Sequence, residues 1–279
     1  MDINGRELSK KIKNEIKDEV DKLDKKPGLA VVLVGENPAS KVYVRHKEKA
    51  CQKVGYFSKK IVLQDNTSEE ELLTLIDELN NDNLIHGILV QLPLPKHIDS
   101  DKVISSINPN KDVDGFHPLN MGKLMIGQKT IISCTPKGII ELIKSTKIDM
   151  NGKNAVVIGR SNIVGKPIAL LLLQNNATVT MCHSRTKNLK KHCLDADIIV
   201  AAVGIPNFVK EDMVKKDCVI IDVGINRLDD GTLAGDVDYK TVHDKVSFIT
   251  PVPGGVGPMT IASLMRNTLE CYKIIEGIE

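Results

Sequence analysis

Short apolar runs alternate along the chain with longer stretches in which apolar residues recur every three or four positions. The runs have the length of buried strands and lie at residues 29–35, 57–63, 85–95, 154–159, 177–182, 197–204, 218–224 and 246–250. The stretches between them have helical spacing, and at 66–82 Ser68 and Glu71 also have the spacing of a capping box. Strands separated by helices predict parallel sheets with right-handed crossovers, and hence an α/β fold.

The pattern weakens in a polar stretch at 107–127 that is interrupted by glycine and proline, as domain junctions often are. We therefore predict a first domain of residues 1–118, completed by the final helix at 258–279, and a second domain of residues 119–279. A helix is expected at the start of the second domain, with Thr135 as its N-cap and Pro136 at its first position.

The helix predicted after the first strand carries an unusual lysine. Tyr43, Lys47 and Val54 are spaced so that they share one face with Ala50 and Cys51. The other side carries cations, namely Arg45, Lys49 and Lys53. Lysine is rarely buried unless it is paired. Lys47 is therefore either a lysine that snorkels from the edge of the core or a functional group.

Composition excludes several classes of function. The 38 basic and 36 acidic residues give a net charge of +2, and only eight residues are aromatic (four Tyr and four Phe), so we expect no nucleic-acid partner. The amphipathic N-terminus lacks the apolar core of a signal peptide, and the apolar runs are too short to cross a membrane. We expect a cytoplasmic protein with no membrane partner.

The six cysteines include no C-x-x-C pair, which suggests reduced core residues. Cys182-His183 and His192-Cys193 could be zinc ligands, but their spacing matches no familiar site, so no metal is expected.

The run at 154–159 leads into "GRSNIVG", which combines a strand, a turn with glycine and a helix N-terminus. Such a turn brings backbone N–H donors and the helix dipole to a pyrophosphate. The match to G-x-G-x-x-G is imperfect, because Ser161 replaces the second glycine and Gly165 comes one residue late. A tight structural turn would look similar. The place of this loop in a βα unit that further strands follow favours dinucleotide binding, with Gly159, Arg160 and Ser161 as candidate contacts.

The following strand indicates which dinucleotide is bound. NAD sites place an acid about 20 residues after the loop to bind the ribose 2′-hydroxyl. No acid lies between 177 and 186, where the chain instead has Ser184 and Arg185. Together with Arg160 these groups would hold a 2′-phosphate. Surface arginines are the alternative, but the missing acid favours NADP.

The chain resembles the bifunctional methylenetetrahydrofolate dehydrogenase/methenyltetrahydrofolate cyclohydrolase family over essentially its whole length. The matching motifs occur in order and are "VGENPASKVYVRHKEKA", "GILVQLPLP", "NPNKDVDGFHP", "CTPKGI", "VVIGRSNIVGKP", "ATVTMCHSRT", "DVGIN", "GDVD" and "FITPVPGGVGPMT". The resemblance implies an N-terminal α/β catalytic domain and a Rossmann-type NADP-binding domain, with the active site in the cleft between them. It further implies a homodimer.

The resemblance also implies the reaction: NADP-dependent oxidation of 5,10-methylenetetrahydrofolate to the methenyl cation, followed by hydrolysis to 10-formyltetrahydrofolate. Tyr43 and Lys47 match the catalytic pair of the family, and Gln91 and Asp114 match two further functional positions. Ser40 matches the family's serine. The loop with Pro253, Gly254 and Gly255 matches the folate-site loop, whose bond before Pro253 is a candidate cis peptide, and Ile225 matches a position near the nicotinamide.

These roles suit the chemistry. Hydride departure leaves a carbon cation flanked by two nitrogens, and the water that attacks it needs a base. Burial and the neighbouring cations would disfavour the ammonium form of Lys47, so its amine is a candidate base. Gln91 could orient the amine or the water, Asp114 could bind the amino-pyrimidine edge of the pterin, and Tyr43 could stack on folate.

Other interpretations remain at this point. Asp112 and Asp114 in "KDVDG" are typical turn residues. The chain could retain only one of the two activities, oxidise another small substrate, or bind nucleotide without catalysis.

Overall fold

The structure is a computed structural model that describes residues 1–278, and the chain divides into two compact units. The first unit contains Lys10–Cys134 and the residues from Ile261 onward, and the second contains Met1–Ser9 and Thr135–Thr260. The units therefore divide after Cys134 rather than after residue 118. Which unit binds which ligand stays a prediction.

The first unit is built on a three-stranded parallel sheet with the order β2-β1-β3. Its strands are β1 (Gly28–Val34), β2 (Phe57–Leu63) and β3 (Gly87–Val90). Every residue of β1 is buried, because β1 is the central strand and both of its faces are covered. Burial of both faces accounts for the continuous apolar run at residues 29–35.

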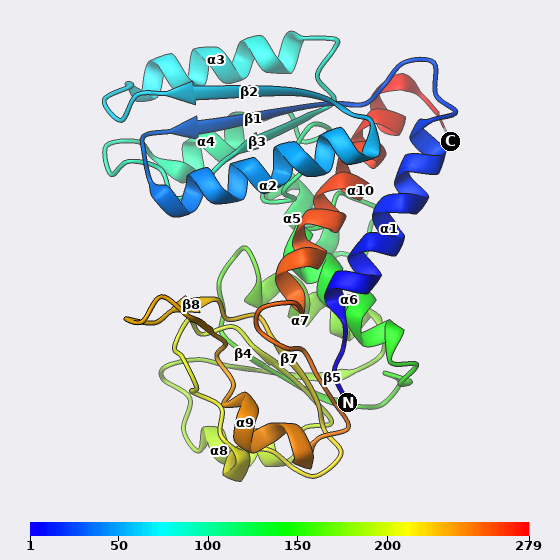
Figure 1. Cartoon of the computed structure of the whole chain (residues 1–279), viewed down its shortest axis with the longest axis vertical. Coiled ribbons are helices and arrows are strands. Elements are labelled where there is room, and N and C mark those ends of the chain that lie inside the picture. Colours follow the sequence, from blue (N-terminus) through cyan, green and yellow to red (C-terminus); the bar gives the residue numbers. More distant parts are fainter. Residues whose placement is uncertain (279) are drawn as a thin grey trace. The chain divides into compact units, whose positions relative to one another are not determined.

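Six helices lie wholly or largely in this unit, as far as residues 1–278 are described. They are α1 (Gly5–Val20), α2 (Pro38–Val54), α3 (Glu69–Asn81), α4 (Ser100–Ser106), α5 (Pro118–Met125) and the last part of α10 (Val256–Glu276). Residues of α3 and α4 form one core with β1 and β3, while α2 lies on the other side of the sheet (Figure 1). Ser68 and Glu71 form the predicted capping box. The short helices α4 and α5 were not predicted, because neither is long enough to show a clear period.

The second unit contains a five-stranded parallel sheet with the order β10-β7-β6-β4-β5. Its strands are β4 (Asn154–Ile158), β5 (Thr178–Cys182), β6 (Ile198–Ala201), β7 (Val219–Asp222) and β10 (Phe248–Ile249). The chain leaves β4 for β5 on one side and then crosses to β6 on the other. This order makes the space beyond β4 and β6 the switch point where doubly wound sheets bind ligands.

Several smaller elements complete the second unit. They are α6 (Cys134–Ser145), α7 (Gly165–Gln174), α8 (Leu189–Leu194), α9 (Tyr239–Val242), the 3₁₀ turns at Glu211–Met213 and His243–Lys245, and the antiparallel pair β8 (Asn226–Arg227) and β9 (Leu233–Ala234). Because α6 already begins at Cys134, Thr135 is its second residue and the N-cap prediction was wrong. Strands as short as β8 and β9 carry no alternation that a sequence pattern could reveal.

The buried face of α2 differs from the predicted stripe. Ala50, Cys51 and Val54 are buried as expected, but Val44 takes the place of Tyr43, which is 42% exposed. The core-facing side therefore agrees with the predicted stripe at three positions and differs at its edge, where Val44 rather than Tyr43 is buried. Tyr43 and the partly exposed Lys47 lie at the edge of the buried face, where both can reach a ligand.

All six cysteines lie within residues 1–278, where they are buried and form no disulfide, as predicted for reduced core residues. Among residues 1–278, no helix combines the length and apolar character that a membrane crossing requires.

Candidate active site

Lys47 contacts a polar side chain from a different part of the first unit. Its Nζ donates a 2.9 Å hydrogen bond to Oε1 of Gln91, which follows β3 directly. The Gln91 side chain is itself held, since its Nε2 donates to the carbonyl of Leu92 at 2.7 Å. Gln91 therefore presents an acceptor to the amine in a defined orientation. The snorkelling interpretation alone does not account for this arrangement.

The segment around Asp112 runs beside β3, with the N–H of Ile88 bonded to the carbonyl of Lys111 at 2.7 Å. The buried carboxylate of Asp112 accepts hydrogen bonds from the backbone N–H groups of Gly115, Phe116 and His117. Asp112 is therefore the residue that closes the turn. The carboxylate of Asp114 is not used in this way, so the turn interpretation applies to one of the two aspartates only.

The environment of Asp114 changes its acid–base behaviour. Burial raises the pKa of Asp114 to about 6, the ammonium of Lys47 acts to lower it, and the neighbouring Asp112 carboxylate raises it. The influence of Lys47 places the two groups in one electrostatic site. Lys47 and Gln91 thus come together from α2 and the end of β3, and the charge of Lys47 acts on the pKa of Asp114 in the loop after α4.

Ser40 and Tyr43 lie on the same helix but in different environments. Ser40 is buried in the first turn of α2, and its N–H bonds to the side chain of the N-cap, Asn37. Tyr43 is one turn further on and exposes its ring to solvent. An exposed aromatic face one turn before Lys47 suits stacking against a planar ligand.

The register of the second sheet brings three chain segments to one edge. Ile158 pairs with both Cys182 and Ala201, so the residues that follow the three strands lie side by side. These residues are Gly159, His183 and Ala202. A Cβ on Gly159 would lie 2.2 Å from the carbonyl oxygen of Ala202, and the φ of Gly159 is +123°. Only glycine allows the two segments to approach this closely.

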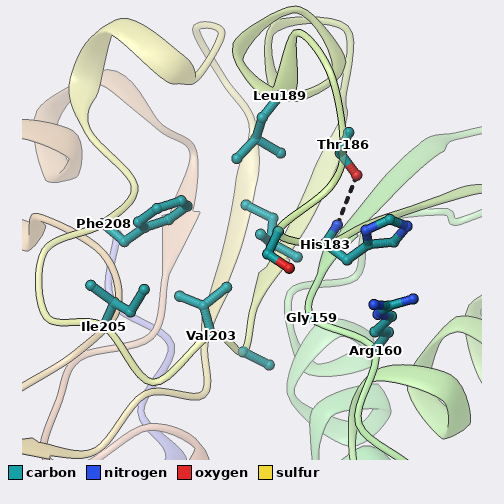
Figure 2. Close-up of a pocket in the computed structure, with 11 residues that line it drawn as sticks. Gly159, Arg160, His183, Thr186, Leu189, Val203, Ile205 and Phe208 are labelled. Atoms are coloured by element: carbon teal, nitrogen blue, oxygen red, sulfur yellow. Dashed lines mark hydrogen bonds between the residues drawn. The ribbon is translucent and has the colours of Figure 1, made fainter.

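A cavity of about 480 Å³ opens at this edge. Its polar side includes Arg160, His183 and Thr186, while Val203, Ile205 and Phe208 lie on the opposite side (Figure 2). Ser184 also lines it, as predicted, whereas Arg185 is not among the lining residues. The cavity therefore combines a cationic, hydroxyl-bearing side with an apolar side, which suits a phosphorylated nucleoside.

Ser161 occupies donors that were expected to be free. Its Oγ accepts 3.2 Å hydrogen bonds from the backbone N–H groups of Val164 and Gly165, at the start of α7. These two N–H groups are therefore paired with the hydroxyl and are not free to bind a pyrophosphate, and cofactor binding by the loop stays a prediction. The Ser161 hydroxyl retains its own proton to donate.

The remaining predicted contacts lie in the second unit. Ile225 is 46% exposed, and its Cδ1 lies 3.6 Å from a Cβ built on Gly257. The bond before Pro253 is cis, as predicted, and so is the bond before Pro93, which was not predicted. Gly255 packs closely against the start of α1, because a Cβ on Gly5 would lie 1.9 Å from its carbonyl oxygen. That the loop at 253–255 lines the folate site stays a prediction.

Comparison with known protein families assigns both halves of the chain. Residues 3–114 match the tetrahydrofolate dehydrogenase/cyclohydrolase catalytic domain, and residues 133–276 match the NAD(P)-binding domain of the same family. The chain belongs to the tetrahydrofolate dehydrogenase/cyclohydrolase family.

Individual members of this family are similar over nearly the whole chain. The bifunctional protein FolD of Acetivibrio thermocellus is 58% identical over 275 residues, which cover 98% of this chain and 96% of the relative. The structure of the bifunctional FolD of Campylobacter jejuni has a TM-score of 0.97 and 50% identity, with 98% of this chain and 99% of that one covered. A Trypanosoma brucei FolD structure, complexed with NADP cofactor and inhibitor, has a TM-score of 0.95 and 37% identity, covering 98% and 97% of the two chains.

Membership of the tetrahydrofolate dehydrogenase/cyclohydrolase family confirms the predicted two-domain α/β fold, a bifunctional enzyme of folate metabolism, and a domain that binds NAD(P). It does not assign roles to single residues.

Sequence reasoning missed part of the lining of this cavity. His183, Thr186 and Phe208 line it but carry no motif of their own. Their positions in the sequence could have identified them, since His183 directly follows β5 and the residues of the apolar wall follow β6. Residues just beyond the carboxyl ends of parallel strands are where such sheets bind ligands.

Proposed function

We propose that the chain oxidises 5,10-methylenetetrahydrofolate with NADP and hydrolyses the methenyl product to 10-formyltetrahydrofolate, with Lys47 as the central catalytic group. The observation that carries this assignment is the hydrogen bond from Lys47 Nζ to Gln91 Oε1 beside the carboxyl of Asp114. A positioned amine, an amide and a carboxylate are the groups that hydrolysis of a cationic folate requires.

Each residue then has a distinct role. Asp114 accepts hydrogen bonds from the amino-pyrimidine edge of the pterin, and Tyr43 stacks on an aromatic part of folate. Ser40, in the first turn of α2, contributes to substrate binding. Gln91 holds the amine of Lys47 where it can take a proton from the attacking water. The base acts in the second step, because only the methenyl carbon is electrophilic enough for water to add.

NADP, when bound, supplies the acceptor for the hydride. The cavity fits its adenosine half, since Arg160 and Ser184 provide charge and a hydroxyl for the 2′-phosphate while Phe208 and Ile205 provide an apolar surface for a base. We propose that the Ser161 hydroxyl donates a hydrogen bond to the pyrophosphate and that Arg185 attracts the 2′-phosphate as NADP approaches. Ile225 would contact the nicotinamide end. We accordingly assign NADP to the second unit and folate to the first, with Pro253, Gly254 and Gly255 as additional folate contacts.

A single spectrophotometric assay tests the proposal. The unmodified protein is mixed with methylenetetrahydrofolate and NADP, and the formation of NADPH and the decay of methenyltetrahydrofolate are followed separately. We expect both activities. If only one activity is found in the unmodified protein, the chain is a monofunctional enzyme. If neither is found, it is a nucleotide-binding protein without catalysis.

The cofactor preference is expected to depend on Arg160. In the unmodified protein kcat/KM should be higher with NADP than with NAD, because no acid faces the ribose 2′ position. Arg160→Ala removes a charged partner of the 2′-phosphate, which is worth roughly 1.5–3 kcal/mol, so the preference should fall by about 10- to 100-fold. Lys187→Ala removes an exposed cation nearby that does not line the cavity and should leave the ratio unchanged. Equal kcat/KM values for the two cofactors in the unmodified protein would refute the 2′-phosphate assignment.

We further propose that the chain acts in the cytoplasm as a homodimer that forms along β2. This strand is at the edge of its sheet, and it exposes Phe57 and Val62 by 48% and 50%. An exposed edge with apolar side chains is a surface that a second copy can cover. Val62→Lys should therefore convert the dimer to a monomer in analytical ultracentrifugation, whereas Met125→Lys, at an exposed position on α5, should not. A protein that sediments as a monomer without substitution would exclude the dimer.

A further inference from the structure

Two aspartates in the second unit are buried but have no role in the proposed chemistry. Asp222 ends β7 and is 3% exposed, and Asp236 follows β9 and is 0% exposed. The carboxylate of Asp222 accepts hydrogen bonds from the backbone N–H groups of Gly224, Asp236 and Val237, at 2.8–2.9 Å. Asp222 thus fixes the backbone that carries Asp236. Burying a carboxylate is costly unless its oxygens are satisfied, so this arrangement requires an explanation.

Asp236 connects two loops that face the cofactor region. Its Oδ2 accepts hydrogen bonds from the N–H groups of Val203, at 2.6 Å, and Gly204, at 2.9 Å. Its Oδ1 accepts a 2.9 Å hydrogen bond from the side-chain amide of Asn226. Val203 lines the cavity after β6, and Asn226 directly follows Ile225. One carboxylate therefore holds both the cavity wall and the segment that carries Ile225.

The backbone around Asp236 holds the same wall further along. The N–H of Asn207 bonds to the carbonyl of Gly235 at 3.0 Å, and the N–H of Val209 bonds to the carbonyl of Asp236 at 2.9 Å. Phe208, on the cavity's apolar side, lies between these two anchor points. The cavity wall is therefore tied to the Gly235–Asp236 segment at both of its ends.

The close packing leaves no room for an alternative arrangement. A Cβ on Gly224 would lie 2.3 Å from Oδ1 of Asp236, and a Cβ on Gly235 would lie 1.8 Å from Oδ2 of Asp222. Both glycines let backbone approach a carboxylate directly. A carboxylate also offers two oxygens that accept only, which matches three N–H donors from two loops.

We propose that Asp236 is a positioning residue for NADP, which holds the apolar wall of the cavity and the Ile225 segment in the arrangement that the cofactor requires. The inference rests on the proposed function, because it assumes that NADP occupies this cavity.

The test compares Asp236→Ala with Asp236→Asn. Alanine releases both loops, and loss of hydrogen bonds to a charged group should raise the Kd and KM for NADP by about 10- to 100-fold. Asparagine keeps an oxygen for the Val203 and Gly204 N–H groups, and the Asn226 amide can rotate to accept from the new NH₂ group. Affinity should then return to within about fivefold of the original. Hydrolysis of supplied methenyltetrahydrofolate should be unchanged in both variants, because Lys47, Gln91 and Asp114, which we propose for this step, belong to the first unit.

Asp238→Ala is the matched control, since its side chain does not cap the following helix α9, and it should not alter NADP binding. Normal NADP affinity in Asp236→Ala would overturn the proposal. Equal defects in the alanine and asparagine variants would also overturn it, since the charge rather than the position would then matter. If Asp236→Ala does not fold, Asn226→Ala frees one loop only; a raised KM for NADP with normal hydrolysis supports the proposal, and an unchanged KM refutes it. Failure of the proposed function would appear separately, as absence of NADP reduction in the unmodified protein.

Discussion

Lys47→Met is expected to abolish most of the cyclohydrolase activity while the fold and NADP binding remain. Methionine retains the length and packing of the lysine stem but cannot take a proton from water. General-base assistance contributes ~10²–10⁴-fold, so hydrolysis of supplied methenyltetrahydrofolate should slow by that factor. The decay of methenyl absorbance, corrected for the uncatalysed reaction, measures the effect. The dehydrogenase step should retain more of its rate, because hydride transfer depends chiefly on how the two ligands are positioned.

Lys49→Met provides the matched control on the same helix. Lys49 is exposed on the solvent side of α2, so its removal should not affect hydrolysis. Lys47→Met also removes the ammonium that acts to lower the pKa of Asp114, so that pKa should rise further in the variant. Hydrolysis at nearly the original rate would place Lys47 among residues that only pack at the edge of the core.

Asp114→Asn is expected to weaken folate binding and, at the same time, to stabilise the protein. A charged hydrogen-bond partner is worth roughly 1.5–3 kcal/mol, so the Kd for folate should rise by about 10- to 100-fold while the Kd for NADP hardly changes. Titration with each ligand separates the two effects. Unchanged folate affinity would return Asp114 to the role of a turn residue, like Asp112.

The stabilisation follows from the raised pKa of Asp114, about 6 against 3.8 for the free side chain. The folded state binds the proton more tightly than the unfolded state. The group therefore favours folding at low pH, and this contribution is lost as the pH rises through about 6. At neutral pH the partly buried carboxylate costs on the order of 3 kcal/mol, which asparagine avoids. Urea unfolding at pH 7 should show the variant to be more stable, and the difference should shrink toward pH 4. A variant less stable than the unmodified protein at pH 7 would contradict this explanation.

The same ionisation predicts a pH dependence for binding. Only the carboxylate form of Asp114 can accept both hydrogen bonds from the amino-pyrimidine edge, so the KM for folate should rise as the pH falls below about 6. Asp114→Asn should remove this dependence. The ionised carboxylate of Asp114 is therefore expected to destabilise the folded protein, and folate binding is expected to offset this cost.

The local features of this chain were predictable because they depend on neighbouring residues. The Ser68–Glu71 capping box and the buried run of β1 follow from side chains within a few positions of each other. The position of Gly159 at a strand–helix turn could likewise be read from the order of its neighbours. The resemblance to the tetrahydrofolate dehydrogenase/cyclohydrolase family added the identities of the candidate catalytic residues, which the pattern alone left open.

The interactions that give those residues their properties could not be predicted in this way. Lys47 and Gln91 are 44 positions apart, and only the fold brings Nζ within 2.9 Å of Oε1. Likewise, no local pattern indicated that the Ser161 hydroxyl occupies the first N–H groups of α7.

The sequence by itself determined the α/β class, the approximate strands and long helices, and the missing acid that favours NADP. Only the tertiary structure decided that Asp112 rather than Asp114 closes a turn, and that Asp236 joins two loops 33 and 10 residues away from it. The physical reason is that secondary structure responds to short-range periodicity, whereas burial, hydrogen-bond partners and pKa depend on groups that meet only after the chain has folded.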